Sequence, residues 1–485
     1  MSDKITLCLE GHNQETAMRE VIKICLEMEI TLQDEIPQEN FVVSHAEVLA
    51  DEIKICTKIN FQDKAGELEY IHKTDPEKNE NQNMTNAVKT GFYRLFTGLF
   101  NRSLPWGSQT GIRPALIASR ILEKVDNPEK AVQVLMEEYS ISREKACLAV
   151  EVALKEEELL KAKPRRGISL YIGIPFCPTR CLYCSFVSLP LSKQKKNVEP
   201  YVEKLCREVE YVGNMIKSQN VTIDSVYIGG GTPTSLTQTQ LETLFSSIKE
   251  HLPLEDIYEF TVEAGRADTI TAEKLEVIKK YTSPEVRISI NPQTLNNSVL
   301  EAIGRNHTAE DFEAAFNLAR KTGFKNINCD LIAGLPGETG EMFISSLKRL
   351  CALDPENITV HTMCVKRAAS LKNSDAVSVS GEEVCSMVSH GSEILRSNGF
   401  SPYYMYRQKD TLGGLENTGF SKPGFEGIYN IFMMEDISTV VGLGAGAVTK
   451  IIHHDTNLIE RTYNFKDPWE YVKNFDEILC RKRLF

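Results

Sequence analysis

The sequence lacks the features of a membrane-inserted or exported protein. It contains no run of about 18 apolar residues, so no membrane span is expected. The first residues, Met1 to Lys4, are polar and are not followed by the apolar core of a secretory signal. Internal repeats and low-complexity tracts are also absent. We therefore expect a cytoplasmic protein.

Positive charge is in the minority. The 55 Lys and Arg residues are outnumbered by 67 Asp and Glu residues, which gives a formal net charge of −12. Binding to nucleic acid depends on Lys and Arg that neutralise phosphates, so no nucleic-acid partner is expected. The length of 485 residues is ample for two or three domains. Apart from one trio, the 13 cysteines are scattered along the chain, which indicates reduced thiols rather than a disulfide framework.

The exceptional cysteines are Cys177, Cys181 and Cys184, which lie within eight residues after an apolar run and a proline. Three thiolates can hold three irons of a 4Fe–4S cluster and leave the fourth iron open to another ligand. The alternatives are three buried thiols or part of a zinc site. The candidate second zinc pair, His453 and His454, lies far along the chain and lacks the usual spacing. The spacing therefore favours the iron–sulfur cluster.

The chain divides into regions of different character. Residues 1–160 predict a separate α+β domain, with strands at 5–9, 41–43 and 53–59 and helices at 14–28, 85–100 and 131–160. A charged loop is expected at 73–83 and a basic linker at 161–167. Residues 168–380 alternate short apolar runs with helical stretches, and residues 381–485 form a third region.

Six apolar runs in the second region predict parallel strands, most of them followed by a helix. They cover 168–174, 225–229, 258–263, 286–290, 326–332 and 358–361. The expected fold class is α/β, a partial (β/α)6 TIM-like barrel, with an open doubly wound sheet as the alternative. In such barrels the chemistry sits at the C-terminal ends of the strands, and the cysteine trio follows the first strand.

The spacing Cys-x-x-x-Cys-x-x-Cys resembles that of radical S-adenosylmethionine (SAM) enzymes. The flanking sequence is similar to the HemZ-type branch of the oxygen-independent coproporphyrinogen III oxidases, also called coproporphyrinogen dehydrogenases, from about residue 168 to the C-terminus. The stretches 404–409, 415–417 and 429–430 also resemble this branch. The resemblance implies a radical SAM core over 168–380, a HemN-like extension over 381–485, and 4Fe–4S and S-adenosylmethionine as cofactors.

The resemblance also implies which residues surround the cofactors. The three cysteines would ligate the cluster. A glycine-rich loop and polar residues near strand ends would bind S-adenosylmethionine, and Tyr171 and Glu263 would lie nearest the reaction. The expected cofactor-binding residues are Tyr171, Tyr183, Gly230, Gly231, Thr232, Glu263, Gln293, Arg305, Asp330 and Val448. Lys366, Arg367 and Arg407 are candidates for binding substrate carboxylates.

The implied activity is oxidative decarboxylation of coproporphyrinogen III to protoporphyrinogen IX by a 5′-deoxyadenosyl radical, with a low-potential donor such as flavodoxin or ferredoxin. Two positions depart from the best-known oxidases: Phe186 replaces a further cysteine, and Asn430 stands where Gln is expected. Both departures concern the substrate rather than the cluster. A haem-binding chaperone on the same scaffold and another radical SAM enzyme therefore remain alternatives.

Overall fold

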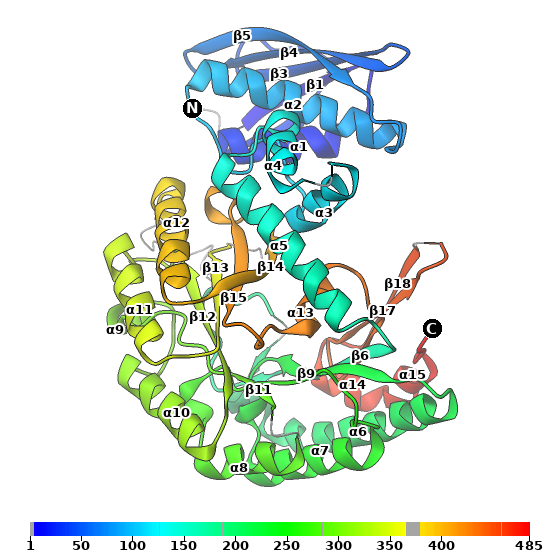
Figure 1. The fold of residues 1–485 in the computed structure, drawn as a ribbon, viewed down its shortest axis with the longest axis vertical. Coiled ribbons are helices and arrows are strands. Elements are labelled where there is room, and N and C mark those ends of the chain that lie inside the picture. Colours follow the sequence, from blue (N-terminus) through cyan, green and yellow to red (C-terminus); the bar gives the residue numbers. More distant parts are fainter. Residues whose placement is uncertain (1–3, 126, 187, 283–284, 365–378, 457) are drawn as a thin grey trace. The chain divides into compact units, whose positions relative to one another are not determined.

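The computed structural model describes residues 4–125, 127–186, 188–282, 285–364, 379–456 and 458–485. The chain packs as two compact units (Figure 1). The N-terminal unit comprises Met1–Ala153 with Arg407–Leu415, and the barrel unit comprises Leu154–Tyr406 with Glu416–Phe485. The domain boundaries expected from the sequence at residues 160, 167 and 380 stay predictions. None of the helices in the described segments combines the length and hydrophobicity that a membrane crossing requires.

The N-terminal unit contains a five-stranded sheet in the order β2-β1-β3-β4-β5. The strands are β1 (Lys4–Glu10), β2 (Glu29–Leu32), β3 (Phe41–Val48), β4 (Glu52–Phe61) and β5 (Lys64–Lys73). One face packs on α1 (Glu15–Leu26) and α2 (Glu80–Phe100) through a core of aliphatic and aromatic side chains. The predicted strands and helices of this sheet are therefore confirmed, whereas β2 and β5 were not predicted.

Two predicted boundaries in this region are wrong. The helix expected at 131–160 is two helices, α4 (Pro128–Tyr139) and α5 (Arg143–Ala162), because Ser140 adopts a left-handed conformation with φ 55° that ends α4. The loop expected at 73–83 is shorter, since a capping box on Asn79 begins α2 at Glu80. The remaining helix of this part is α3 (Pro114–Val125).

Six parallel strands form the centre of the barrel unit. They are β6 (Ile168–Ile174), β9 (Ile223–Gly230), β10 (Glu259–Glu263), β11 (Arg287–Ser289), β12 (Asn326–Ala333) and β13 (Asn357–Thr362). Neighbouring strands in the sheet are also successive in the chain. A doubly wound sheet would reverse its strand order at a switch point, so this order confirms the partial TIM-like barrel.

Helices cover the outside of this sheet (Figure 1). They are α6 (Leu191–Ser218), α7 (Gln238–His251), α8 (Ala272–Tyr281), α9 (Asn297–Ala302), α10 (Ala309–Thr322), α11 (Gly340–Ala352) and α12 (Gly381–Ser397). The strands alternate apolar and polar side chains accordingly. In β6, for example, Leu170 and Ile172 are fully buried, while Tyr171 between them faces the other side. The apolar face binds the helices, and a polar inner face remains for the site.

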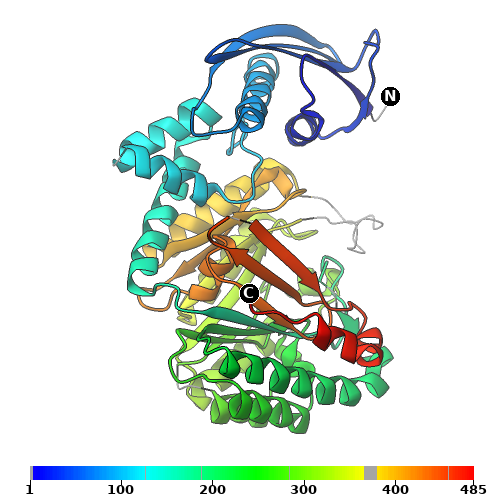
Figure 2. The same cartoon turned by 90° about the vertical axis from the view of Figure 1, so that its right-hand side faces the viewer.

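The C-terminal region extends the same sheet at both edges. On one side β15 (Glu416–Ser421) pairs with β13 and lies beside β14 (Ser401–Arg407). On the other side β16 (Val440–Leu443) pairs with β6, followed by β17 (Val448–His453) and β18 (Leu458–Tyr463). The short helices are α13 (Ile428–Met434), α14 (Pro468–Lys473) and α15 (Phe475–Cys480). Helices α14 and α15 pack beside α6 (Figure 2).

A buried carboxylate on α6 fastens the glycine-rich segment that joins β16 to β17. Glu208 accepts hydrogen bonds from Gly444 N (2.7 Å), Tyr471 Oη (2.6 Å) and Asn464 Nδ2 (3.0 Å). Lys482 Nζ lies 2.7 Å from the same carboxylate, so the buried charge is paired. This network holds the β16–β17 turn at the C-terminal end of β6, where the cysteine loop begins.

Candidate active site

The cysteine loop leaves the barrel at the C-terminal end of β6. Its start, β7 (Phe176–Cys177), pairs with β8 (Leu189–Pro190), which leads into α6. Cys177, Cys181 and Cys184 are free thiols, and the backbone N–H of Cys184 donates to the carbonyl of Cys181 at 3.2 Å. Burial, with a smaller contribution from the neighbouring sulfurs, raises the pKa of Cys177 and of Cys184. The loop therefore brings the three predicted ligands together in a poorly solvated place.

Two buried arginines flank this loop. Arg266 is 2% exposed and is held by Asp268 through two parallel hydrogen bonds of 3.0 and 2.9 Å. Its Nη1 donates to the carbonyl and hydroxyl oxygens of Thr179 at 3.1 and 2.8 Å and lies 4.0 Å from Cys181 Sγ. Arg266 thus fixes the backbone of the loop and directs positive charge at one thiol.

The second arginine is Arg305, which was predicted from the sequence. Its Nη1 donates to the carbonyls of Gly265 (3.1 Å) and Asn291 (2.8 Å), and its Nη2 donates to Tyr183 Oη at 3.1 Å. The structure therefore brings Arg305 and Tyr183 together beside Cys181. Among the described residues, Arg305 Nε and Asn291 Oδ1 are buried without a hydrogen-bond partner. Such groups are costly to bury and are suited to receive a polar ligand.

The glycine-rich loop after β9 packs directly on the cysteine loop. Gly231 N donates to Ile174 O at 2.7 Å, and Thr232 N donates to Phe176 O at 2.8 Å. Thr232 Oγ1 lies 3.4 Å from Cys177 Sγ. A Cβ on Gly231 would lie 2.6 Å from Phe176 O, so only glycine permits this approach. The neighbouring Gly230, with φ 106°, also needs to be glycine.

A carboxyl group with an unusual pKa occupies the inner face at the end of β10. Glu263 accepts hydrogen bonds from Tyr227 Oη and, at 3.1 Å, from Asn291 Nδ2. Burial, reinforced by the negative charge of Asp330, raises the pKa of Glu263 to about 7. Tyr171 stacks on Tyr227 with 6.3 Å between ring centroids. Glu263 can therefore hold or release a proton near neutral pH.

A carboxylate–imidazole pair lies two strands away. Asp330 Oδ2 is 3.6 Å from His361 Nε2, and Asn328 Nδ2 donates to Asp330 Oδ1 at 2.9 Å. Although burial opposes ionisation of both groups, their mutual attraction lowers the pKa of Asp330 and raises the pKa of His361. Gln293 N donates to Asp330 O at 3.0 Å, and Gln293 has φ 69°. Gln293 and Asp330 therefore meet at adjacent strand ends, as the strand order requires.

A model of the radical SAM superfamily matches residues 171–350. The chain is 40% identical to the oxygen-independent coproporphyrinogen-III oxidase-like protein HemZ of Bacillus subtilis over 413 residues, or 84% of this chain and 82% of that protein. The chain belongs to the radical SAM superfamily, in the family of HemZ.

Two further comparisons extend this result. The heme chaperone HemW of Lactococcus lactis is 33% identical to this radical SAM protein over 284 residues, or 58% of this chain and 68% of that protein. The structure of coproporphyrinogen III oxidase (HemN) from Escherichia coli matches with a TM-score of 0.52 at 24% identity, covering 67% of this chain and 73% of that one. At this identity the HemN comparison supports the fold.

The cofactors of the radical SAM superfamily are a 4Fe–4S cluster and S-adenosylmethionine, as predicted from the sequence. The donor set fits them, because three soft thiols lie beside buried cationic and polar groups. In the described segments no three Cys, His, Asp or Glu side chains are arranged for a single metal ion. A cluster differs in this respect, since each thiolate binds a different iron. The alternative zinc pair also lies away from the cysteines. His453 ends β17, which runs antiparallel to β16 and β6, so it lies toward the N-terminal end of β6, whereas the cysteine loop follows the C-terminal end.

Val448 joins the site through sheet register. Gly442 pairs with Tyr171, and Tyr171 pairs with Tyr227. The antiparallel register of β16 and β17 places Val448 opposite Gly442, where a Cβ on Gly442 would meet the Val448 backbone at 2.7 Å. Residues in one cross-strand row face the same side of a sheet. Val448 therefore shares the inner face with Tyr171 and Tyr227.

Of the three candidates for binding substrate carboxylates, the structure describes only Arg407. Lys366 and Arg367 lie outside the described residues. Arg407 belongs to the N-terminal unit, where its guanidinium donates to the carbonyls of Gln109 and Gly414. These bonds give Arg407 a structural role in that unit.

The sequence reasoning missed Tyr227, Asn291, His361 and Arg266. The first three could have been found from their position, since each lies on or just beyond a predicted strand, at the polar positions of the alternating pattern. Arg266 follows a strand and carried no such signal.

Proposed function

We propose that this protein catalyses the oxygen-independent oxidative decarboxylation of coproporphyrinogen III to protoporphyrinogen IX in the cytoplasm. The observation that carries the proposal is the gathering of three thiols, two buried arginines and a titratable carboxyl group at one end of a polar barrel. The substrate class is suggested by the similarity to HemZ, whose name describes a coproporphyrinogen-III oxidase-like protein.

Each part of the site has a proposed role. Cys177, Cys181 and Cys184 would hold three irons and leave one for S-adenosylmethionine. When bound, these cofactors supply a carbon-centred radical that removes a hydrogen atom from an unactivated C–H bond. The residues proposed to bind S-adenosylmethionine are Tyr171, Tyr183, Gly230, Gly231, Thr232, Glu263, Gln293, Arg305, Asp330 and Val448.

The protein itself would position the substrate and exclude water. At the N-terminal start of β11, the buried Arg287 is 2% exposed, lies 3.9 Å from Glu259 and donates to Tyr403 Oη at 3.5 Å. Tyr429 stacks on Tyr227 at 4.7 Å between centroids and completes an aromatic wall with Tyr171. Such a wall suits the pyrrole rings of a porphyrinogen.

Each of two propionate side chains loses one hydrogen atom, one molecule of carbon dioxide and one electron, and becomes a vinyl group. The electron leaves to an external one-electron acceptor. Glu263 and Tyr171, which interact with Tyr227 at the inner face, are the protein groups proposed to lie nearest the reacting carbon and to keep it apart from bulk water.

A haem-binding chaperone is the second candidate. Phe186 stands where the best-known oxidases carry a further cysteine, and its side chain is 70% exposed. The similarity to a heme chaperone of Lactococcus lactis points in the same direction. In this case the scaffold would bind haem without turning over coproporphyrinogen III.

Anaerobic turnover by the reconstituted protein distinguishes the two functions. Coproporphyrinogen III, S-adenosylmethionine and a strong reductant would be supplied, and the products analysed by mass. Loss of two carbon dioxide units that is abolished in Cys181→Ala, but retained in the control Cys351→Ala, is the expected result. Tight haem binding without decarboxylated product would establish the chaperone. Deoxyadenosine formation without change of the porphyrinogen would assign another substrate.

A further inference from the structure

The segment that contains the cysteine loop has an unusual charge. Between Glu158 and Glu199 the sequence contains no Asp or Glu, although acidic residues outnumber basic ones in the whole chain. The basic residues of this segment that follow β6 are Arg180, Lys193, Lys195 and Lys196. The cluster end of the segment is therefore cationic in a protein with a net charge of −12.

The fold places these charges around the cysteine loop. Arg180 is exposed, lies between two of the ligand cysteines, and contributes positive charge near Cys184. Cys177 pairs with Pro190, the residue immediately before α6. The exposed Lys193 and Lys196 follow in the first two turns of α6. Positive charges, here called the cationic rim, therefore lie within the loop at Arg180 and at the start of the helix that follows it, at Lys193 and Lys196.

An exposed aromatic ring lies between the residues of this rim in the sequence. The Phe186 side chain is 70% exposed, which makes it the most exposed of the large hydrophobic side chains in the described segments. The backbone N–H of Phe186 hydrogen-bonds to the thiol of Cys184. Phe186 lies two positions after Cys184, so the two Cα atoms are separated by at most about 7 Å. The exposed ring therefore belongs to a residue that lies close to a predicted cluster ligand.

We propose that Phe186, Arg180, Lys193 and Lys196 form the docking surface for an acidic one-electron carrier protein that reduces the cluster. This inference rests on the proposed function, because it presumes a cluster that must be reduced. The overall charge of −12 would repel an acidic partner, so productive approach depends on a local cationic surface. A small apolar centre with a charged rim fits a transient electron-transfer contact, which belongs to the small class of protein interfaces.

The charge pattern also selects the partner's chemistry. A cationic or neutral carrier would gain nothing from the rim, whereas a carrier with a ring of carboxylates around its redox group would be oriented by it. Because the cations are exposed, the attraction would be screened by salt, and the rate of reduction should fall as ionic strength rises.

The test compares two reductants on the full-length protein with its cluster reconstituted. One is a reduced flavodoxin of acidic surface, and the other is photoreduced deazaflavin, a small molecule without a docking requirement. The variants are Lys193→Glu and the matched control Lys217→Glu, an exposed lysine at the far end of the same helix. The two lysines are roughly 36 Å apart along the axis at the rise of an α-helix. Both substitutions change the net charge equally.

With flavodoxin at low salt, the second-order rate constant for reduction of Lys193→Glu should fall about ten-fold or more, and its salt dependence should weaken. Lys217→Glu should stay near wild type, and deazaflavin should reduce all three proteins at equal rates. A second variant, Phe186→Ser, should slow reduction by flavodoxin but keep the salt dependence of the wild type. Iron content measured on each protein confirms that the cluster is retained.

Equal flavodoxin rates for Lys193→Glu and Lys217→Glu, with normal reduction by deazaflavin, would overturn the docking surface and leave the proposed function intact. A wild-type protein whose cluster is not reduced by deazaflavin would instead overturn the proposed function, and this inference with it.

Discussion

Arg266 directs its Nη1 at Cys181 Sγ from 4.0 Å, while its other nitrogens are held by Asp268. A charged donor near a cluster sulfur stabilises the more negative, reduced state and so raises the reduction potential. Asp268 orients Arg266 in the same way that residues behind the ligands orient those ligands in many metal sites.

We expect Arg266→Gln to lower the midpoint potential of the cluster and to destabilise the protein. The stability loss should be roughly 2–3 kcal/mol, because Asp268 is then left without its partner in a partly buried place. Redox titration monitored by electron paramagnetic resonance and urea unfolding measure the two effects. The double variant Arg266→Gln/Asp268→Asn should recover stability but not the potential. An unchanged potential in Arg266→Gln would contradict the electrostatic role.

Gly231→Ala should separate the glycine-rich loop from the cysteine loop. The new Cβ would lie 2.6 Å from Phe176 O and 2.9 Å from Ile174 O, and backbone atoms have little freedom to move away. Overpacking of this kind costs about 1–3 kcal/mol, and we expect reduced iron content and weaker S-adenosylmethionine binding. Gly340→Ala is the control, since no atom lies within 4 Å of its added Cβ. Normal iron content and affinity in Gly231→Ala would show that the loops need not touch.

Glu263 should make stability depend on pH. Its pKa is about 7 in the folded protein against an ordinary value of 4.5, so the folded state binds more protons between these values. The free energy of unfolding contributed by this group should therefore fall by up to about 3 kcal/mol as pH rises through this window. Urea unfolding of wild type and Glu263→Gln, without cofactors, from pH 4.5 to 8 measures the difference.

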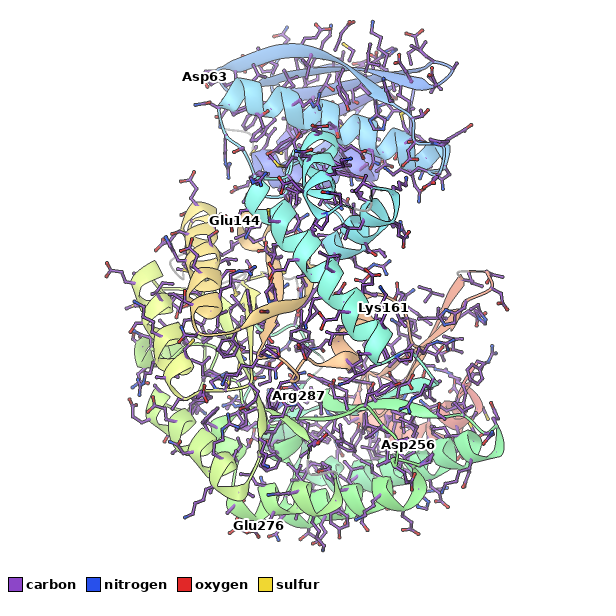
Figure 3. The ribbon with its side chains drawn as sticks, viewed as in Figure 1. Asp63, Glu144, Lys161, Asp256, Glu276 and Arg287 are labelled. Atoms are coloured by element: carbon purple, nitrogen blue, oxygen red, sulfur yellow. The ribbon has the colours of Figure 1, made fainter. Side chains whose placement is uncertain are left out.

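The Glu263→Gln variant should lack this slope. Glu276→Gln, at an exposed position on α8 (Figure 3), should behave like the wild type. Parallel pH profiles for the wild type and Glu263→Gln would mean that the carboxyl group titrates at its ordinary pKa.

The Asp330–His361 pair should be visible in the titration of the imidazole. Asp330 raises the pKa of His361 above 6.5, so the stability that the imidazole contributes is complete below pH 6.5 and is lost as pH rises through its folded-state pKa. We expect Asp330→Asn to lower the pKa of His361, measured by nuclear magnetic resonance of labelled histidine with His361→Gln for assignment. Asp256→Asn, at an exposed position before β10, is the control. An unshifted His361 resonance would show that the pair does not form in solution.

The barrel strands were predictable because their signal is local. Apolar runs such as Ile168–Ile174 and Asn326–Ala333 must be buried against helices, and each is bounded by glycine or by polar residues. The N-terminal unit was harder. Its edge strand β5 alternates exposed and half-buried side chains and has no fully buried residue, so the apolar signal is weak. The break between α4 and α5 depends on one left-handed serine, which the pattern of apolar residues does not encode.

The sequence by itself determined the spacing of the three thiols, the alternation that turns polar side chains inward, and the family that these features resemble. Only the tertiary structure decided which inward side chains meet. Arg266 reaches Cys181, Tyr227 reaches Glu263, and Val448 joins the row of Tyr171 across Gly442. The physical reason is that local periodicity fixes which face of a strand a residue occupies, whereas its neighbours across the sheet depend on strand order and register, which are set by the packing of the whole barrel.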